Sequence, residues 1–155
     1  TFWDTAIKVI AGIHNIENWK DLKQRNEHNN LLQSIFWANI NSVELFASTS
    51  KKAGANFDSW RKVKNASEEC FDSTERLLHL FKPNLIIIFD WNSQVKNKDY
   101  FWTKQDKYID YAFDKERNTH IYKTAHPLFL NREHLYKETI NGIIASAKER
   151  IKNTS

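Results

Sequence analysis

The longest unbroken apolar run of the chain lies at positions 85–89 and consists of Leu85-Ile86-Ile87-Ile88-Phe89. Branched and aromatic residues without a polar interruption are typical of a strand that is covered on both faces, as in a parallel sheet flanked by helices. Pro83 stands just before the run and favours a turn there. We therefore expect a central strand at residues 85–89, with polar residues directly after its carboxyl end.

Helical and extended patterns alternate around this strand. Apolar spacings of three and four predict helices that open the chain at residues 2–13, that start at Asp58 or Ser67 and stop at Lys82-Pro83, and that close the chain after Asn131. Strands are expected at residues 31–40, 108–114 and 120–125, the last two as a pair joined by a turn at 115–119. Residues 18–30 are expected to form a loop with one helical turn.

This alternation favours an α/β fold, a three-layer α/β/α sandwich with a short, mainly parallel central sheet. The 155 residues, with 41% hydrophobic and 27% charged positions and a mean hydropathy of −0.67, match an ordinary globular domain. We expect one domain over residues 1–155. Methionine is absent even at position 1, which suggests either that the sequence begins after a processing point or that it is a fragment of a longer chain.

Cysteine content and hydropathy bear on the compartment. Cys70 is the only cysteine, so the chain cannot form an internal disulfide, which is usual in a reducing compartment. No apolar run is long enough to cross a bilayer, and no signal segment opens the chain. We expect a cytoplasmic monomer without membrane contact.

Several classes of catalytic and cofactor site lack their motifs. Gly12, Gly54 and Gly142 are scattered, which excludes a P-loop or a Rossmann glycine loop, and no nucleophile elbow is present. A metal site could be considered from four side chains near the carboxyl terminus, but their spacing matches no known metal motif. These four are His120, His126, Glu133 and His134. We expect neither a metal nor a cofactor.

Polar residues follow three of the predicted strands, where ligands bind in open α/β sheets. The three groups are Asn39 with Asn41, Asp90-Trp91-Asn92, and His126-Pro127. Pro127 holds its loop extended and directs the imidazole forward, and Arg132 is expected at a helix start. The alternative is that each group only completes a turn, and that Leu128 and Phe129 enter the core.

Aromatic and basic stretches suggest a nucleic-acid partner. Residues 100–104 combine Tyr, Phe and Trp with Lys, and residues 60–64 and 148–152 are basic. Such segments can stack on bases or contact phosphates, although core packing and a solvated helix face are the ordinary alternatives. The net charge of +4 permits contact with DNA without requiring it.

Three stretches resemble the uracil-DNA glycosylase superfamily. Phe36-Trp37-Ala38-Asn39-Ile40-Asn41 is similar to the strand of that family that ends in a base-reading asparagine. Residues 82–90 are similar to its Lys-Pro-led central strand, and Thr124-Ala125-His126-Pro127 to its His-Pro-Ser loop. The order of the stretches and the helices between them also fit, over residues 31–150.

The resemblance implies base excision from DNA, single- or double-stranded, through a flipped uracil and an oxocarbenium-like state. It implies that His126 is catalytic and donates a hydrogen bond to the departing uracil anion. Asp90, which follows the central strand, is the second expected catalytic residue. Substrate binding would fall to Asn39, which hydrogen-bonds the base edge, and to Asn41, Trp91 and Asn92. DNA contact would fall to Pro127, to Leu128 or Phe129 as a wedge in the base stack, and to Arg132 on a phosphate.

The chain also departs from the pattern of the family. The first motif, a loop with Gly and Pro that supplies the water-activating acid, has no counterpart, because the only prolines are Pro83 and Pro127. Leu128 replaces the serine of the His-Pro-Ser loop, and Asp90 replaces a glycine.

Two explanations account for these departures: either the first motif lies upstream of Thr1, or the chain is a divergent member with altered activity. The alternatives are a non-catalytic nucleic-acid-binding or protein-interaction domain, or an unrelated hydrolase using His126 and Asp90.

Overall fold

The computed structural model describes residues 2–24, 29–35, 78–89 and 100–154. Contacts divide the chain into two units, the first made of Thr1–Ile35 with Pro83–Ser155 and the second of Phe36–Lys82. Each unit is considered by itself. In the second, residues 78–81 are helical and Lys82 has a positive φ of 42°, so the predicted stop before Pro83 is confirmed. Phe81, in the last turn of this helix, is 55% exposed.

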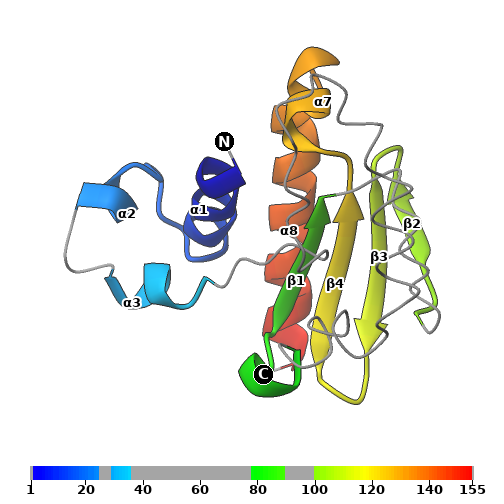
Figure 1. The fold of residues 1–155 in the computed structure, drawn as a ribbon. Helices are drawn as coiled ribbons and strands as arrows, with labels where there is room; N and C mark the ends of the chain where they lie inside the picture. Colours follow the sequence, from blue (N-terminus) through cyan, green and yellow to red (C-terminus); the bar gives the residue numbers. More distant parts are fainter. Residues whose placement is uncertain (1, 25–28, 36–77, 90–99, 155) are drawn as a thin grey trace, which may run out of the picture. The chain divides into compact units, whose positions relative to one another are not determined.

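The first unit holds a four-stranded mixed sheet in the order β1-β4-β3-β2 (Figure 1). The strands are β1 (Leu85–Phe89), β2 (Thr103–Asp106), β3 (Ile109–Asp114) and β4 (Thr119–Thr124). Strands β1 and β4 are parallel, whereas β2 and β3, and β3 and β4, are antiparallel. The prediction of a mainly parallel sheet is therefore wrong, because turns as short as residues 107–108 and 115–118 can only join antiparallel neighbours.

The predicted strand at residues 85–89 and the predicted strand pair are confirmed. Among the described strands β1 lies at one edge and pairs with β4. Its central place in the sheet stays a prediction, because the strand predicted at residues 36–40 lies outside the described residues. Strand β2 was not predicted at all. All four of its residues are exposed, so it carries no apolar alternation that a sequence pattern could detect.

The first unit also contains five described helices, of which α8 packs directly against β3 and β4. They are α1 (Phe2–Ile13), α2 (Asp21–Gln24), α3 (Asn29–Gln33), α7 (Pro127–Arg132) and α8 (Tyr136–Thr154). The predicted opening and closing helices are confirmed as α1 and α8. However, Asn131 does not cap the closing helix, because residues 127–132 form the separate helix α7, which Pro127 opens at its first turn.

Helix α3 contradicts the start of the strand predicted at residues 31–40. Leu31, Leu32 and Gln33 are helical, and the Ser34 hydroxyl donates to the Leu31 carbonyl at 2.6 Å, which satisfies one acceptor at the end of the helix. A short apolar run fits a strand and a buried helical turn equally well, which is why the pattern misled here. The rest of that prediction, residues 36–40, lies outside the described residues.

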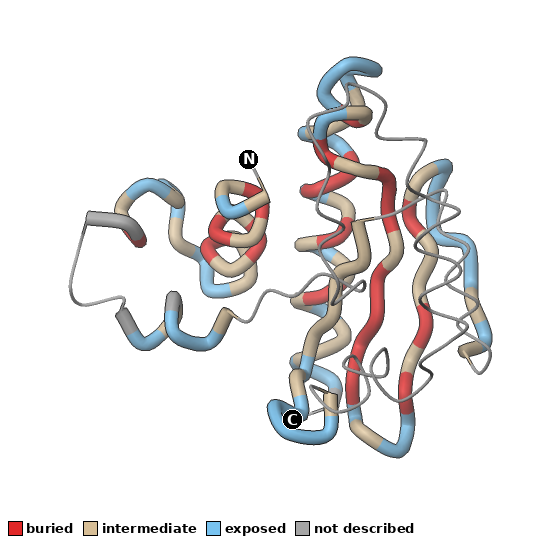
Figure 2. Tube along the Cα trace, in the orientation of Figure 1, coloured by how far each residue is buried: buried red, intermediate tan, exposed pale blue. Residues whose placement is uncertain are grey.

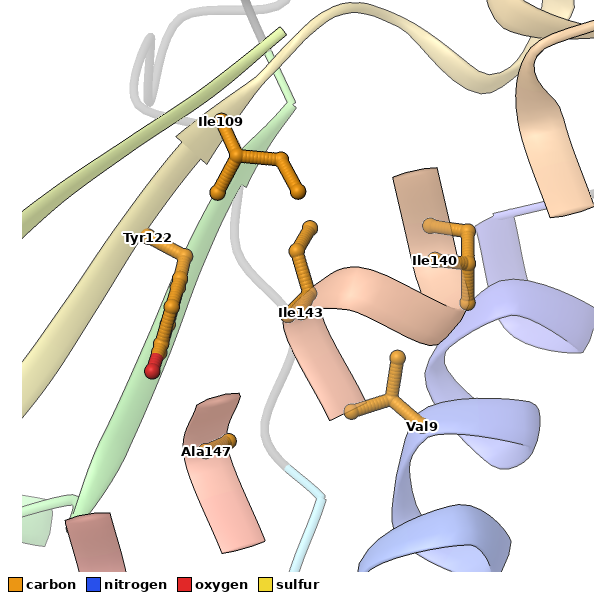
Figure 3. Packing of buried hydrophobic residues seen from close by; sticks show 6 residues of the cluster. All are labelled: Val9, Ile109, Tyr122, Ile140, Ile143 and Ala147. Atoms are coloured by element: carbon orange, nitrogen blue, oxygen red, sulfur yellow. The ribbon is translucent and has the colours of Figure 1, made fainter. Parts of the chain in front are cut away.

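The core lies between the sheet and α8 (Figure 3). Ile109 and Tyr122 project from the sheet toward Ile143, and Val9 of α1 joins the same cluster. The cluster comprises Val9, Ile109, Tyr122, Ile140, Ile143 and Ala147. Figure 2 shows the buried positions concentrated on β4 and alternating along β3, while β2 is exposed. The predicted inward stripe of α8 is thereby confirmed at its centre.

Helix α1 is buried on two sides rather than along one stripe. Val9 faces the core under α8, while Ile7 and Ala11 pack with Leu22 in a second cluster. Trp3, predicted to face inward, is 53% exposed. A helix buried on two sides does not show the single apolar stripe that spacing arguments assume.

Candidate functional site

The candidate site lies where the parallel strands β1 and β4 end. Phe89 and Thr124 are register partners at these ends, and Ala125 and His126 follow directly (Figure 1). Thr124 is fully buried, and among the described residues its Oγ1 has no hydrogen-bond partner. The prediction that His126 follows the carboxyl end of a strand is confirmed.

His126 is the N-cap of α7. Its Nδ1 accepts a hydrogen bond from the backbone N–H of Leu128 at 3.1 Å, and its carbonyl accepts from the N–H of Leu130 at 3.1 Å. An imidazole nitrogen that accepts carries no proton, so the proton of the neutral ring is on Nε2. The cap therefore fixes the tautomer in which Nε2 is a hydrogen-bond donor.

Phe2 supports the imidazole from the other end of the chain. The Phe2 ring lies edge-on to His126 with centroids 4.7 Å apart and an interplanar angle of 86°, and 5.7 Å from Phe89. The sequence showed Phe2 only as one residue of an apolar stripe. No local pattern could reveal its contact with His126, because the contact joins segments that are remote in sequence.

The three residues after Pro127 have different environments. Leu128 is 73% exposed, Leu130 is fully buried, and Phe129 is half-buried with its ring 5.7 Å from that of Tyr108. The alternative in which Leu128 and Phe129 both enter the core is therefore wrong for Leu128. Of the two residues proposed as a wedge, Leu128 is the one that reaches solvent.

Arg132 is in the last turn of α7 and not at a helix start, which corrects the prediction. Its guanidinium carbon is 5.5 Å from the centroid of the Phe129 ring, and its Nε is 3.5 Å from Glu133 Oε1. The side chain is 74% exposed. A cation at a helix C-terminus faces the negative end of the helix dipole, so Arg132 stabilises α7 as well as presenting a charge to solvent.

A polar network lies beneath α8, away from the strand ends. Arg150, in the basic stretch 148–152, places its guanidinium carbon 3.9 Å from the Tyr111 ring centroid and donates to Ser146 Oγ at 3.2 Å. Ser146 also hydrogen-bonds Tyr122 at 2.9 Å and donates to Gln105 at 3.0 Å. The basic stretch at residues 148–152 is therefore not a simple phosphate-binding face.

Burial shifts the pKa of two groups in this network. Burial, followed by the nearby charge of Arg150, lowers the pKa of His120, whose Nδ1 lies 3.0 Å from the Tyr111 hydroxyl. Burial also raises the pKa of Tyr122. Both groups are thus held neutral inside the unit, as expected for ionisable groups in a low-dielectric core.

The aromatic stretch at residues 100–104 divides between core and surface. Tyr100 donates to Asp114 Oδ2 at 3.3 Å and its ring lies 6.1 Å from that of Trp102, while Phe101 is 98% exposed. Arg117 also donates to Asp114 Oδ2, at 2.7 Å. Phe101 is the most exposed aromatic side chain of this stretch, and its predicted stacking on bases stays a prediction.

Within the described ranges, no three side chains of the His, Cys, Asp or Glu type come close enough together to hold a metal ion. His120, His126, Glu133 and His134 thus do not form a cluster. No helix in these same ranges is long and apolar enough to cross a bilayer.

The remaining predicted site residues, Asn39, Asn41, Asp90, Trp91 and Asn92, lie outside the described residues. Their convergence with His126 stays a prediction. Comparisons of the chain with protein-family models, curated proteins and solved structures find no match. The resemblance to uracil-DNA glycosylases therefore stays a hypothesis that depends on the motifs themselves.

Proposed function

We propose that the chain is a uracil-DNA glycosylase-like protein that removes a flipped uracil, or a related base, by hydrolysis of the N-glycosidic bond. One observation carries the proposal. His126, at the carboxyl end of the parallel pair β1 and β4, uses Nδ1 to cap α7, so its neutral ring carries the proton on Nε2. Such a donor at a strand end is what stabilisation of a departing base requires.

The chemistry needs a donor that does not itself lose its proton. When the bond between sugar and base breaks, the bonding electrons stay on the base, and the sugar becomes oxocarbenium-like until water adds to it. A preorganised N–H that donates to the developing anion lowers this barrier. The Phe2 ring and the cap from Leu128 both restrict the imidazole, so the donor is held in place before the substrate arrives.

Leu128 supplies the second support for the proposal. An exposed apolar side chain on a short, capped helix two residues beyond the donor can enter the gap that a flipped base leaves in the stack. In this proposal Arg132 contacts a phosphate, Asn39, Asn41, Trp91 and Asn92 bind the base, and Asp90 assists catalysis.

Excision of uracil from an end-labelled, uracil-containing oligonucleotide tests the proposal. We expect His126→Asn to lower the excision rate by about 10²–10³-fold, the usual cost of losing one such donor. Asparagine is a good N-cap, so this variant keeps an acceptor for the Leu128 N–H while it loses the Nε2 donor. The test therefore separates catalysis from capping of α7.

The matched control is His134→Asn, an exposed histidine just beyond α7 with a positive φ of 59° that asparagine tolerates. This control should excise uracil at the wild-type rate. If the wild type releases no uracil but retains salt-sensitive DNA binding, the enzyme proposal fails and the non-catalytic binding domain becomes the better hypothesis.

A further inference from the structure

The turn between β2 and β3 meets α7 at the end of the sheet that holds the candidate site (Figure 1). This turn consists of Lys107 and Tyr108. The Tyr108 ring packs against the Phe129 ring at 5.7 Å with an interplanar angle of 67°, a favourable edge-to-face arrangement. The contact joins two segments that the sequence analysis did not connect.

A cationic side chain lies close to each ring of this pair. The Lys107 ammonium is 5.1 Å from the Tyr108 centroid, and the Arg132 guanidinium carbon is 5.5 Å from the Phe129 centroid. Both cationic residues are exposed. Ring contacts of this kind restrict a long flexible side chain and leave its charge facing water.

The spacing of the two cations suits a nucleic-acid strand. Three successive contacts of 5.1, 5.7 and 5.5 Å link Lys107 to Arg132. These contacts keep the two charges close enough together to meet phosphates only a few nucleotides apart on one duplex. The exposed Leu128 lies in the same helix as Arg132, so an apolar tip accompanies the two charges.

Two carboxylates lie close to these cations and bear on the argument. Asp106 Oδ1 accepts from the backbone N–H of Lys107 at 2.6 Å, so its nearest contact is with the turn itself. Glu133 lies 3.5 Å from Arg132 and competes with a phosphate for that guanidinium. Lys107 has no carboxylate partner within the described part of the chain, which makes it the more available of the two cations.

We infer that Lys107, Tyr108, Phe129 and Arg132 form one contact surface for duplex DNA, called here the turn–α7 surface. In it Lys107 and Arg132 contact phosphates, and the two packed rings hold the cations at a fixed spacing. The choice of DNA as the partner rests on the proposed function. The new element is the β2–β3 turn, which neither the motifs nor the resemblance assigns to DNA.

The salt dependence of binding to a short duplex that contains no uracil tests this inference, because no excision then takes part. Each phosphate contact adds about 0.9 to the magnitude of the slope of log Kobs against log salt concentration. We expect Lys107→Ala to reduce that magnitude by about 0.9 and to weaken binding at low salt. Lys107→Arg should retain the wild-type slope, because it keeps the charge.

The matched control is Lys115→Ala, an exposed lysine at the opposite end of β3. This variant changes the net charge by the same amount and should leave the slope unchanged. An unchanged slope in Lys107→Ala, an equal change in both variants, or no salt-sensitive binding by the wild type overturns the inference. Because excision is measured separately, a changed slope without uracil release supports the surface while the proposed function fails.

Discussion

His120 is a residue whose ionisation is coupled to folding. It is buried on β4, its Nδ1 lies 3.0 Å from the Tyr111 hydroxyl, and its ring centroid is 4.9 Å from that of Phe113. Burial and the nearby Arg150 charge lower its pKa below the ordinary value of 6.5. The folded state therefore holds His120 neutral at a pH where the unfolded chain already binds a proton.

The lowered pKa of His120 means that the free energy of unfolding falls as the pH falls. The contribution of a neutral, buried histidine is fully present above pH 6.5 and is lost as the pH falls from there through the pKa of the folded state. We expect the wild type to lose about 1.4 kcal/mol of unfolding free energy for each unit by which the pKa of His120 in the folded state lies below its pKa in the unfolded state. His120→Gln, which does not titrate, should show a weaker loss between about pH 7 and pH 5 in urea denaturation.

The Asp114 carboxyl acts in the same direction but in a separate pH range. Burial raises its pKa, yet hydrogen bonds and charge from Arg117, with a hydrogen bond from Tyr100, outweigh burial and lower the pKa below 3.8. The contribution of Asp114 to stability is lost only at a pH below about 4, so it does not affect the comparison of the wild type with His120→Gln between about pH 7 and pH 5. Equal pH slopes for the wild type and His120→Gln would rule out His120 as the source.

At the scale of elements, two helix glycines differ in how closely neighbouring side chains approach them. A Cβ on Gly12 of α1 would meet Ile144 Cγ2 at 2.7 Å and Cδ1 at 2.8 Å, whereas a Cβ on Gly142 of α8 would meet only the terminal Cδ1 of Ile109 at 2.9 Å. We expect Gly12→Ala to destabilise by about 1–3 kcal/mol through overpacking of α1 against α8. Gly142→Ala should stabilise by up to about 1 kcal/mol through helix propensity, because the flexible end of Ile109 can move aside.

Urea denaturation of both single variants measures this contrast. A control for the mechanism is Gly12→Ala in an Ile144→Ala background, where the contacting carbons are gone. There the added methyl should no longer destabilise, which appears as a coupling energy in the double-mutant cycle. A Gly12→Ala variant as stable as the wild type, or more stable, would show that the α1–α8 contact is not a tight one.

The elements that could be predicted from sequence are those in which burial produces a local pattern of apolar side chains. Strand β1 is an apolar run, β3 and β4 alternate, and α8 has an apolar face, so burial leaves a local pattern. Strand β2 is exposed and leaves none. Parallel strands were expected, but the sequence did not predict that β1 pairs with β4. The antiparallel remainder of the sheet depends on turn length, which apolar patterns do not encode.

The candidate site shows the same division. The place of His126 at a strand end could be predicted, because the strand and Pro127 are both visible in the sequence. Its Nδ1 cap depends on α7 starting at Pro127, where a longer loop was expected. The contacts of Phe2 with His126 and of Tyr108 with Phe129 join distant segments, and a single sequence carries no signal of such pairs.

At the scale of the first unit, α1 at the beginning of the chain is bound to the start of α8. Thr5 of α1 shares a hydrogen bond of 2.8 Å with the hydroxyl of Tyr136, the first residue of α8. The Lys8 ammonium lies 4.8 Å from the Tyr136 ring and 5.1 Å from the Trp19 ring. The helix that carries Phe2 is thus fixed to the helix that follows α7, which keeps Phe2 beside His126.

The charge of the whole molecule raises a separate question about DNA binding. The chain has 23 basic and 19 acidic side chains, a net charge of +4 that attracts any polyanion. Glu133 lies 3.5 Å from Arg132 at the turn–α7 surface, whereas Glu116 is exposed in the turn between β3 and β4, at the other end of β3 from Lys107 and Tyr108. Neutralising either one raises the net charge equally.

Glu133→Gln and Glu116→Gln therefore distinguish a local surface from a general attraction. We expect Glu133→Gln to tighten duplex binding by up to about fivefold, because a surface ion pair that competes with a phosphate is worth at most about 1 kcal/mol. Glu116→Gln should leave the affinity unchanged at moderate salt, since charges beyond about 10 Å are screened there. Titration of both variants at one fixed salt concentration makes the comparison. Equal tightening by the two would mean that DNA responds to the net charge of the molecule and not to the arrangement around Arg132.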